Sequence, residues 1–386
     1  MRRFRTAFQT LLDTLVRPSF HLFGRPWPFY GLFVCSGVIL GSGFALLLAR
    51  ATGLSVSTTA TVVVAGTAAA ILFALVTEVL TGREVYTFYH YQILVIAGGA
   101  GLLAWLDRPV LPSLDLVALA LGVVQGVGRL GCLMAGCCHG RPHGWGVRYG
   151  EAHAEQGFAR SLVGVRLFPI QAVESLCLFT LTAAGTALVL SGRPPGSALA
   201  TYLVGYGTLR FGLELARGDS LRPFARGFSE AQWTAGFVVT ATVALEAAGL
   251  LPLAPWHLAA LVALAVTATA AARYRRANPA HRLLQPAHVS EVAGLLAALA
   301  HRAPGDLLVA CTSQGVRMSW SALPGREAHY ALSLREGEMT ERTAGALARL
   351  IVRLRHPAHG VQLVRGSHGV FHLLVGETRS TLEGRS

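Results

Sequence analysis

The sequence predicts an all-α polytopic membrane bundle of seven or eight transmembrane helices, followed by a small soluble α+β domain. Composition is the first reason: 53% of the 386 residues are hydrophobic and only 14% are charged, whereas a soluble domain carries about 25% charged residues. The second is a series of apolar runs of spanning length between residues 30 and 272. The third is the cluster Arg273-Tyr274-Arg275-Arg276, which follows the last run and is typical of a chain leaving the membrane.

The apolar runs are the candidate helices of the bundle. The last run is about 17 residues long, which is the lower limit for a span, so the count stays at seven or eight. In order, they extend from Tyr30 to Ala49, Thr59 to Leu80, His90 to Trp105, Leu114 to Cys138, Pro169 to Leu190, Ala198 to Ala216, Phe228 to Leu250 and Trp256 to Ala272.

The segments outside the runs divide the chain into residues 1–28, 29–273 and 285–386. The start resembles a signal peptide, but Asp13 and Arg17 interrupt its apolar region and no small-residue cleavage site follows. We therefore expect residues 1–28 to carry an amphipathic helix that lies in the membrane interface. Its apolar face would consist of Phe4, Phe8, Leu11, Leu12 and Leu15.

Residues 285–386 show the mixed periodicity of a small α+β domain. No catalytic motif is visible in it, so we expect an accessory or partner-binding role. The predicted helices are Ser290 to Ala300 and Thr340 to Arg355; the predicted strands are Asp306 to Cys311, Gly315 to Ser321 and His329 to Leu334, with a closing hairpin of Gly360 to Arg365 and Val370 to Val375.

All 33 basic residues are arginines, and the formal net charge is +13. Each guanidinium is a planar fork that suits phosphate or carboxylate, and a basic protein favours anionic lipid surfaces. Nucleic acid is not expected as a partner, because the arginines are spread between apolar runs rather than gathered in one basic domain.

Arg129 lies inside the fourth apolar run, ten residues before its predicted end. A charged residue in such a helix costs about 2.5–3.5 kcal/mol to insert, which makes it a candidate functional residue. The alternative is that it reaches the interface and only anchors the helix. Ten helical residues span about 15 Å, which is too deep for that, so we expect a buried anion site. Neighbouring glycines, Gly131 among them, allow a second helix or a lipid head group to approach closely.

Two further apolar runs carry polar side chains. Tyr206, Arg210, Glu214 and Arg217 form one stripe along the sixth run. The stripe is either a self-neutralising ion pair that holds the bundle together or a site in which Glu214 orients Arg210 toward a phosphate. Gln171 and Glu174 begin the fifth run, where Glu174 is either a simple helix cap or part of the same site.

Histidines and cysteines supply the remaining candidates. Histidine as a residue type suits proton transfer near neutral pH, which makes His90 and His139 candidates, although interfacial histidines are often only solvated. Cys132, Cys137 and Cys138 precede His139 in a C-x4-C-C-H spacing, which fits no common zinc pattern. A metal site and a reactive thiol are the alternatives, but small packing residues are expected, with no metal and no cofactor.

The side of the membrane on which these residues lie is open. The connections 139–168 and 218–227 share one face of an up-and-down bundle, and both are rich in arginine. Either the arginine excess marks this face as cytoplasmic, or the arginines are retained for substrate binding. We favour substrate binding.

Five motifs occur in a recognisable order: Tyr30-Gly31, GRLGCLMAGCCHGRP at 128–142, FPIQAVE at 168–174, YGTLRFGLELAR at 206–217 and FSEAQ at 228–232. In order and spacing, residues 25 to 250 resemble the bacterial prolipoprotein diacylglyceryl transferase family. That resemblance implies an integral bundle of the inner membrane with its active site on the periplasmic side. The implied reaction moves the diacylglyceryl group of phosphatidylglycerol, or another anionic phospholipid, to the lipobox cysteine thiol of a preprolipoprotein, and glycerol phosphate leaves.

The resemblance also implies roles for single residues. Arg129 matches the signature arginine, Gly140 its closing glycine, and Tyr30 the tyrosine of the first span. The expected catalytic residues are His90, Arg129, Tyr206, Arg210 and Glu214. The expected substrate-binding residues are Tyr30, Gly131, Cys132, Cys137, His139, Gly140, Arg141, Gln171, Glu174 and Arg217.

The chain also departs from the family pattern. Two asparagines and a glutamate of the signature are here Cys132, Ala135 and Cys137, and the histidine before Pro169 is Phe168. These changes remove polar contacts to the lipid head group. Two alternatives therefore stay open: a phospholipid-dependent enzyme with another acceptor, using Cys137 or Cys138 as a covalent thiol, and a lipid-binding protein without activity.

Overall fold

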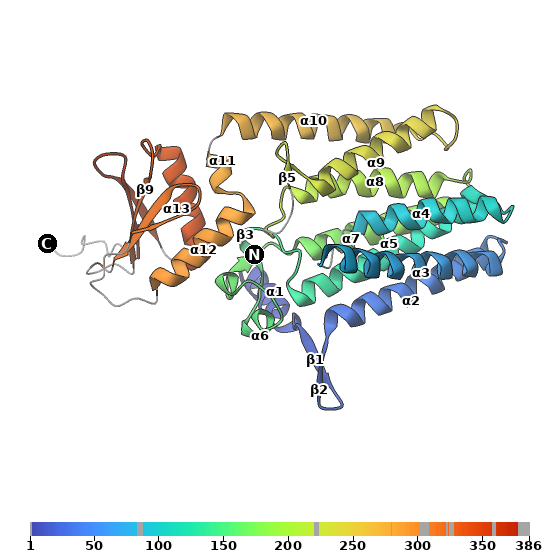
Figure 1. Cartoon of the computed structure of the whole chain (residues 1–386), viewed down its shortest axis with the longest axis horizontal. Helices are drawn as coiled ribbons and strands as arrows, with labels where there is room; N and C mark the ends of the chain where they lie inside the picture. Colours follow the sequence, from blue (N-terminus) through green and yellow to red (C-terminus); the bar gives the residue numbers. More distant parts are fainter. Residues whose placement is uncertain are drawn as a thin grey trace.

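The structure is a computed structural model of the chain that describes residues 2–82, 88–219, 224–278, 280–300, 309–321, 323, 328–356 and 360–376. It consists of a bundle of long helices and a smaller sheet domain at one end of that bundle (Figure 1). The predicted fold class is confirmed.

Up-and-down helices form the bundle, with their axes roughly aligned (Figure 1). Five helices of the described chain, α2, α3, α5, α7 and α10, are long and apolar enough to cross a membrane, so the predicted count of seven or eight is not confirmed. The bundle helices are α2 (Phe29–Ala51), α3 (Val56–Thr81), α4 (Phe88–Trp105), α5 (Val110–Ala135), α7 (Ile170–Leu190), α8 (Ser197–Glu214), α9 (Glu230–Ala247) and α10 (Pro255–Ala277).

Helix α5 is the axis of the bundle. Of the apolar stretch that makes α5 a spanning candidate, 67% is buried, whereas the share is at most 28% in the other four spanning candidates. Helices α2, α4, α7 and α8 all pack against it. Small residues permit the closest of these contacts, because a Cβ on Gly41 of α2 would lie 2.8 Å from the Ala120 carbonyl oxygen of α5.

The end of α5 differs from the prediction. The sequence predicts a helix that continues to Cys138, but α5 ends at Ala135. Gly136 adopts the left-handed conformation with φ of 78°, and its N–H bonds to the Cys132 carbonyl, which is the usual termination by glycine. Cys137 and Cys138 therefore lie in the turn after the helix.

A structured connection joins α5 to α7. Strand β3 (Pro142–Arg148) pairs antiparallel with β4 (Arg166–Leu167), with the short helices α6 (Glu151–Ala154) and η1 (Arg160–Leu162) between them. A second short pair, β5 (Phe224–Ala225) and β6 (Phe228–Ser229), precedes α9.

The N-terminal helix is confirmed as α1 (Arg2–Leu15). It packs against β3, and its Asp13 forms an ion pair of 3.0 Å with Arg166 of β4. Residues 19–28 form a hairpin that the sequence did not predict, made of β1 (Ser19–Leu22) and β2 (Arg25–Pro28). The position of α1 in a membrane interface stays a prediction.

The C-terminal part is an antiparallel sheet of five strands in the order β10-β11-β9-β8-β7. One face of this sheet packs on α12 and α13, as alternate buried strand residues show. The α+β prediction is confirmed within the described residues, and positions 306–308 lie outside them. The elements are α11 (Ala280–Leu283), α12 (Pro286–Ala300), β7 (Val309–Cys311), β8 (Val316–Ser321), β9 (Ala328–Leu334), α13 (Glu341–Arg355), β10 (Val361–Arg365) and β11 (Phe371–Val375).

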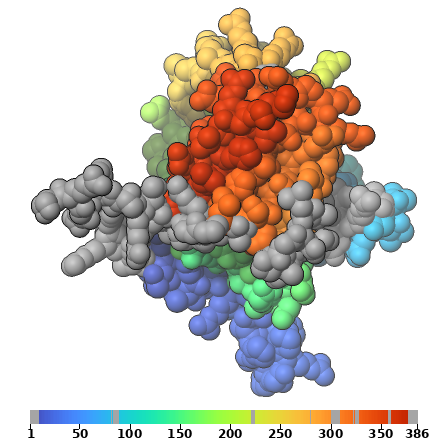
Figure 2. Space-filling model, turned by 90° about the vertical axis from the view of Figure 1, so that its left-hand side faces the viewer, coloured from blue at the N-terminus to red at the C-terminus, as the bar shows by residue number. Residues whose placement is uncertain are grey.

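One hydrophobic core joins the sheet domain to the α5–α7 connection. Val147 and Leu162 of the connection share a buried cluster with Val292 of α12 and Leu347 of α13. Viewed from this end, the sheet domain lies over the bundle (Figure 2). It is therefore on the same end as the connection, while the division into residues 1–28, 29–273 and 285–386 stays a prediction.

Candidate active site

Glu174 of α7 lies at the centre of the polar groups inside the bundle. Its side chain is buried, with Oε2 2.9 Å from Nε of Arg129 and Oε1 3.7 Å from Nε of Arg210. The hydroxyl of Tyr206 donates to Oε1 at 2.9 Å. One carboxylate thus joins α5, α7 and α8, and it pairs with the side chains of other helices. The interpretation of Glu174 as a simple helix cap does not describe these contacts.

Glu214 extends these contacts along α8. Its Oε2 is 2.7 Å from Nη1 of Arg210 and 3.7 Å from Nη1 of Arg217. Arg217 in turn donates from Nε and Nη2 to the two oxygens of Asp219, both at 2.9 Å. We call this set the arginine–carboxylate cluster: Arg129, Glu174, Arg210, Glu214, Arg217 and Asp219.

The cluster contains three arginines and three acidic residues, so its charges balance. A buried charge without a partner is unfavourable, and removing one partner of a buried pair costs about 3–5 kcal/mol. Because each charge here has an opposite partner, the groups can be buried. Arg129 uses only Nε in the cluster, and its two Nη groups have no partner within the described chain. Its residual exposure of 9% leaves these donors accessible. A second anion can therefore bind at Arg129 without separating the existing pairs.

A hydrogen-bonded chain fixes Tyr206 from the side of α5. Tyr202 donates to the Gln125 side-chain oxygen at 3.2 Å, and the Gln125 amide donates to the Tyr206 hydroxyl. Gln125 and Tyr202 were not among the residues predicted from the sequence. Their spacing is informative, however. Gln125 lies four residues before Arg129 and Tyr202 lies four residues before Tyr206, so each shares a helix face with a residue that was predicted.

Gln171 and Tyr149 connect the start of α7 to the turn after α5. The Gln171 amide donates to the Cys137 carbonyl at 2.7 Å and to the Tyr149 hydroxyl at 3.4 Å. The Gln171 side-chain oxygen is buried and has no partner among the residues that the structure describes. Burial raises the pKa of Tyr149 above its ordinary value, so this hydroxyl stays protonated.

His139 and Gly140 join the turn to the residues after α8. His139 is buried, with Nδ1 2.9 Å from the Gly140 carbonyl oxygen, so it is not a solvated interfacial histidine. Burial lowers its pKa below the ordinary 6.5. Only glycine fits at position 140, since a Cβ there would lie 2.4 Å from the Phe168 carbonyl oxygen. Arg141 donates from Nε to the Arg217 carbonyl at 3.3 Å.

Gly131 and Tyr30 are at the contact between α5 and α2. A Cβ on Gly131 would lie 2.8 Å from Cβ of Phe33, so glycine allows α2 to approach α5 here. The Tyr30 backbone lies at the same contact, because its carbonyl oxygen would be 3.3 Å from that Cβ. The structure thus brings most of the predicted substrate-binding residues to the loop end of α5.

His90 has a different environment from the other predicted catalytic residues. Its Nε2 is 3.0 Å from Oε1 of Glu230, and both side chains are more than a third exposed. Its neighbour Tyr89 is buried and packs on Tyr206 with ring centroids 5.6 Å apart. Tyr89 was missed as a candidate, although it is the residue of this pair that contacts Tyr206.

Comparison with known proteins gives a consistent result. The family model described as prolipoprotein diacylglyceryl transferase matches residues 19–247.

A phosphatidylglycerol–prolipoprotein diacylglyceryl transferase of Clostridium tetani is 34% identical over 110 residues, which are 28% of this chain and 43% of the relative. The relative numbered 2 in Clostridium perfringens is 36% identical over 118 residues, 28% and 41% of the two chains. The Dehalococcoides mccartyi protein of the same name is 27% identical over 221 residues, 53% and 82% of the two chains. The chain thus matches less than half the length of the first two relatives.

Proposed function

Because the chain belongs to the prolipoprotein diacylglyceryl transferase family, we propose that it is a multi-pass transferase of the bacterial inner membrane. Its donor is phosphatidylglycerol, and its acceptor is the lipobox cysteine thiol of a prolipoprotein. The names of the relatives support this choice of substrates.

The main support is the pair of guanidinium groups on Glu174. Arg129 and Arg210 lie on the two oxygens of one buried carboxylate, and the Nη groups of Arg129 have no partner within the described chain. The phosphate of a phospholipid is an anion of the size and geometry that such a fork binds. In a low-dielectric site, these fixed cations stabilise the charge that develops on a leaving phosphate.

The reaction forms one bond and breaks one bond. The acceptor sulfur forms a bond to the glycerol carbon of the lipid, and the carbon–oxygen bond to the phosphate breaks. Glycerol phosphate leaves with the electron pair, and the thiol proton passes to a base. Two histidines can accept it: Nε2 of His139 is the free acceptor when Nδ1 donates to Gly140, whereas His90 has Glu230 as its partner.

The position of the sheet domain supports a role for this domain near the proposed active site. It packs on the α5–α7 connection, which carries the turn beside Arg129, so it lies on the same end of the bundle as the cluster. The family resemblance implies a periplasmic position for this end. An accessory role in receiving the peptide acceptor agrees with that position.

Lipid transfer to a lipobox peptide tests the proposal. The purified chain is incorporated into vesicles with phosphatidylglycerol, and the diacylglyceryl mass added to the peptide is measured. We expect Arg129→Ala to lower the transfer rate by about 100-fold or more, because fixed donors for a leaving anion contribute that much. Arg193→Ala is the matched control, since Arg193 is exposed in the link at the opposite end of the bundle.

Wild-type transfer by Arg129→Ala, with Arg193→Ala equally active, would refute the assigned role. Binding of phosphatidylglycerol by the wild-type chain without any transfer would instead support the alternative of a lipid-binding protein.

A further inference from the structure

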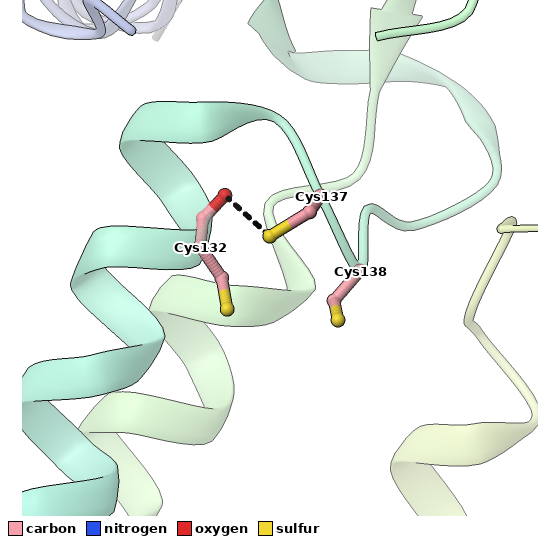
Figure 3. A group of neighbouring side chains, drawn as sticks. All are labelled: Cys132, Cys137 and Cys138. Atoms are coloured by element: carbon pink, nitrogen blue, oxygen red, sulfur yellow. Dashed lines mark hydrogen bonds between the residues drawn. The ribbon is translucent and has the colours of Figure 1, made fainter. Parts of the chain in front are cut away.

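Three thiols lie together at the end of α5. The sulfur atoms of Cys132, Cys137 and Cys138 are all within 4.8 Å of one another. Cys132 comes from the last turn of the helix, and the other two come from the turn that follows (Figure 3). In this view the sulfur of Cys137 points toward Cys132, and the sulfurs of Cys132 and Cys138 both point downward.

The backbone of the turn explains how adjacent cysteines reach one point. Gly136 has φ of 78° and Cys138 has φ of 53°, so two of these three consecutive residues are left-handed and the chain turns sharply after α5. A left-handed conformation is unfavourable for a residue with a side chain, and such outliers gather at functional sites.

The sulfur positions fit a single ion. Metal–sulfur bonds to Zn²⁺ are about 2.3 Å long, so sulfurs around one ion are roughly 3.8 Å apart in a tetrahedral site and roughly 4.0 Å apart in a trigonal one. The observed limit of 4.8 Å therefore requires a contraction of at most about 1 Å between any two of the sulfurs. The three thiols also hydrogen-bond to one another, and Cys137 bonds weakly to the Cys132 carbonyl, at 3.9 Å.

The surroundings favour the thiolate form of Cys138 and access to the site. Hydrogen bonds from Cys132 and Cys137, and then the positive charges of Arg217 and Arg129, stabilise the Cys138 thiolate, which is the form that binds metals. Cys132 is buried, whereas Cys137 is exposed, so an ion can enter from the surface through Cys137.

We propose that Cys132, Cys137 and Cys138 form a binding site for one thiophilic metal ion, either Zn²⁺ or Cu⁺. Both ions prefer thiolate ligands. No fourth histidine, cysteine or carboxylate belongs to the group in the described chain, so Zn²⁺ would keep one open coordination position and Cu⁺ would have three sulfur ligands. This site does not depend on the proposed transferase activity.

Metal binding by the full-length chain tests this site. The protein is purified in detergent under reducing conditions, and the bound metal is measured by elemental mass spectrometry after loading with Zn²⁺, or with Cu⁺ in the presence of a competing chelator. Co²⁺ serves as a spectroscopic probe, because thiolate ligands give it charge-transfer absorption. We expect about one ion per chain at micromolar or lower concentration, as for other thiolate sites.

The chain offers a matched control. Replacing Cys132, Cys137 and Cys138 by serine should abolish binding, whereas replacing the three remaining cysteines, Cys35, Cys177 and Cys311, should leave it unchanged. Cys137→Ser alone keeps the test valid if the first variant fails to fold. Because its thiol is exposed, this variant should fold and bind Co²⁺ at least about 10-fold more weakly.

Two results would overturn the proposal: no binding of either ion to the reduced wild-type chain, or equal binding by both triple variants. None of these readouts measures lipid transfer, so failure here is distinguishable from failure of the proposed function.

Discussion

Two buried carboxylates of the bundle have opposite kinds of partner. Asp115, on α5, accepts hydrogen bonds of 2.7 Å from the backbone N–H groups of Gly196 and Leu199 at the start of α8. Glu174, on α7, contacts Arg129, Arg210 and Tyr206 instead. Asp115 therefore accepts hydrogen bonds from backbone N–H groups that would otherwise be unpaired at the start of α8. Glu174 instead pairs with Arg129, whose Nη groups have no partner in the described chain.

We propose that this difference separates a structural charge from a functional one. Both acids are buried, so burial alone does not distinguish them. The Asp115 contacts are backbone amides that have no other use. At Glu174, the Nη groups of Arg129 are without partners in the described chain, and that unused capacity is what a substrate anion requires.

Glu174→Gln should give the largest effect. The amide keeps the shape of the side chain but leaves Arg129 and Arg210 without their shared charge. Loss of one partner from a buried pair costs about 3–5 kcal/mol, and a displaced catalytic group lowers the rate by about 100-fold. We expect lipid transfer to fall by that factor, together with a lower thermal unfolding midpoint. Transfer at the wild-type rate would show that Glu174 does not position the arginines.

Asp115→Asn is the counterpart and should be smaller. It removes a charged acceptor from two backbone donors, each worth about 1.5–3 kcal/mol when the partner is charged, and the amide oxygen retains part of this. We expect a lower thermal unfolding midpoint with an unchanged transfer rate per folded molecule. A selective loss of transfer, without loss of stability, would contradict the structural role.

The smallest expected effect is the contribution of His153, in the α5–α7 connection, to the pH dependence of the free energy of unfolding. His153 accepts from the Gly150 N–H at Nδ1 and contacts the Met134 carbonyl through Nε2, so the neutral ring satisfies both. Burial lowers the pKa of His153 below 6.5, and protonation therefore favours the unfolded chain. Its stabilisation is complete above pH 6.5 and declines as the pH falls below that value toward the lower folded-state pKa.

Unfolding midpoints between about pH 8 and about pH 5 measure this contribution. His153→Gln should show a flatter pH profile than the wild type, whereas replacing the exposed His21 by glutamine should leave the profile unchanged. An equally steep profile in His153→Gln would assign the dependence to other groups.

Local patterns were sufficient for much of the fold. The apolar runs predicted the bundle helices, and alternation predicted the strands of the sheet domain, because burial imposes a period on each kind of element. The end of α5 was missed because the run stays apolar through Leu133, Met134 and Ala135, while the left-handed Gly136 decides where the helix stops. The hairpin at residues 19–28 was missed because it is short and mostly exposed.

The polar residues of the site were recognised one helix at a time. Arg129, Glu174 and Arg210 each stood out, since a charge in an apolar run needs a partner. Their meeting was not visible in any single run, because it depends on how α5, α7 and α8 pack. Likewise, the sequence named His90 and His139 together, but only the packing separates an exposed ion pair with Glu230 from a buried ring beside Gly140.

From the sequence alone came the membrane character, the order of elements and the family resemblance, because each depends on composition or on residues close together in the chain. The tertiary structure decided which charges share a carboxylate and which domain packs on the α5–α7 connection, and the turn after α5 decided where three thiols meet. The first two features join residues far apart in the chain, and they depend on close packing between elements, which a linear pattern does not contain.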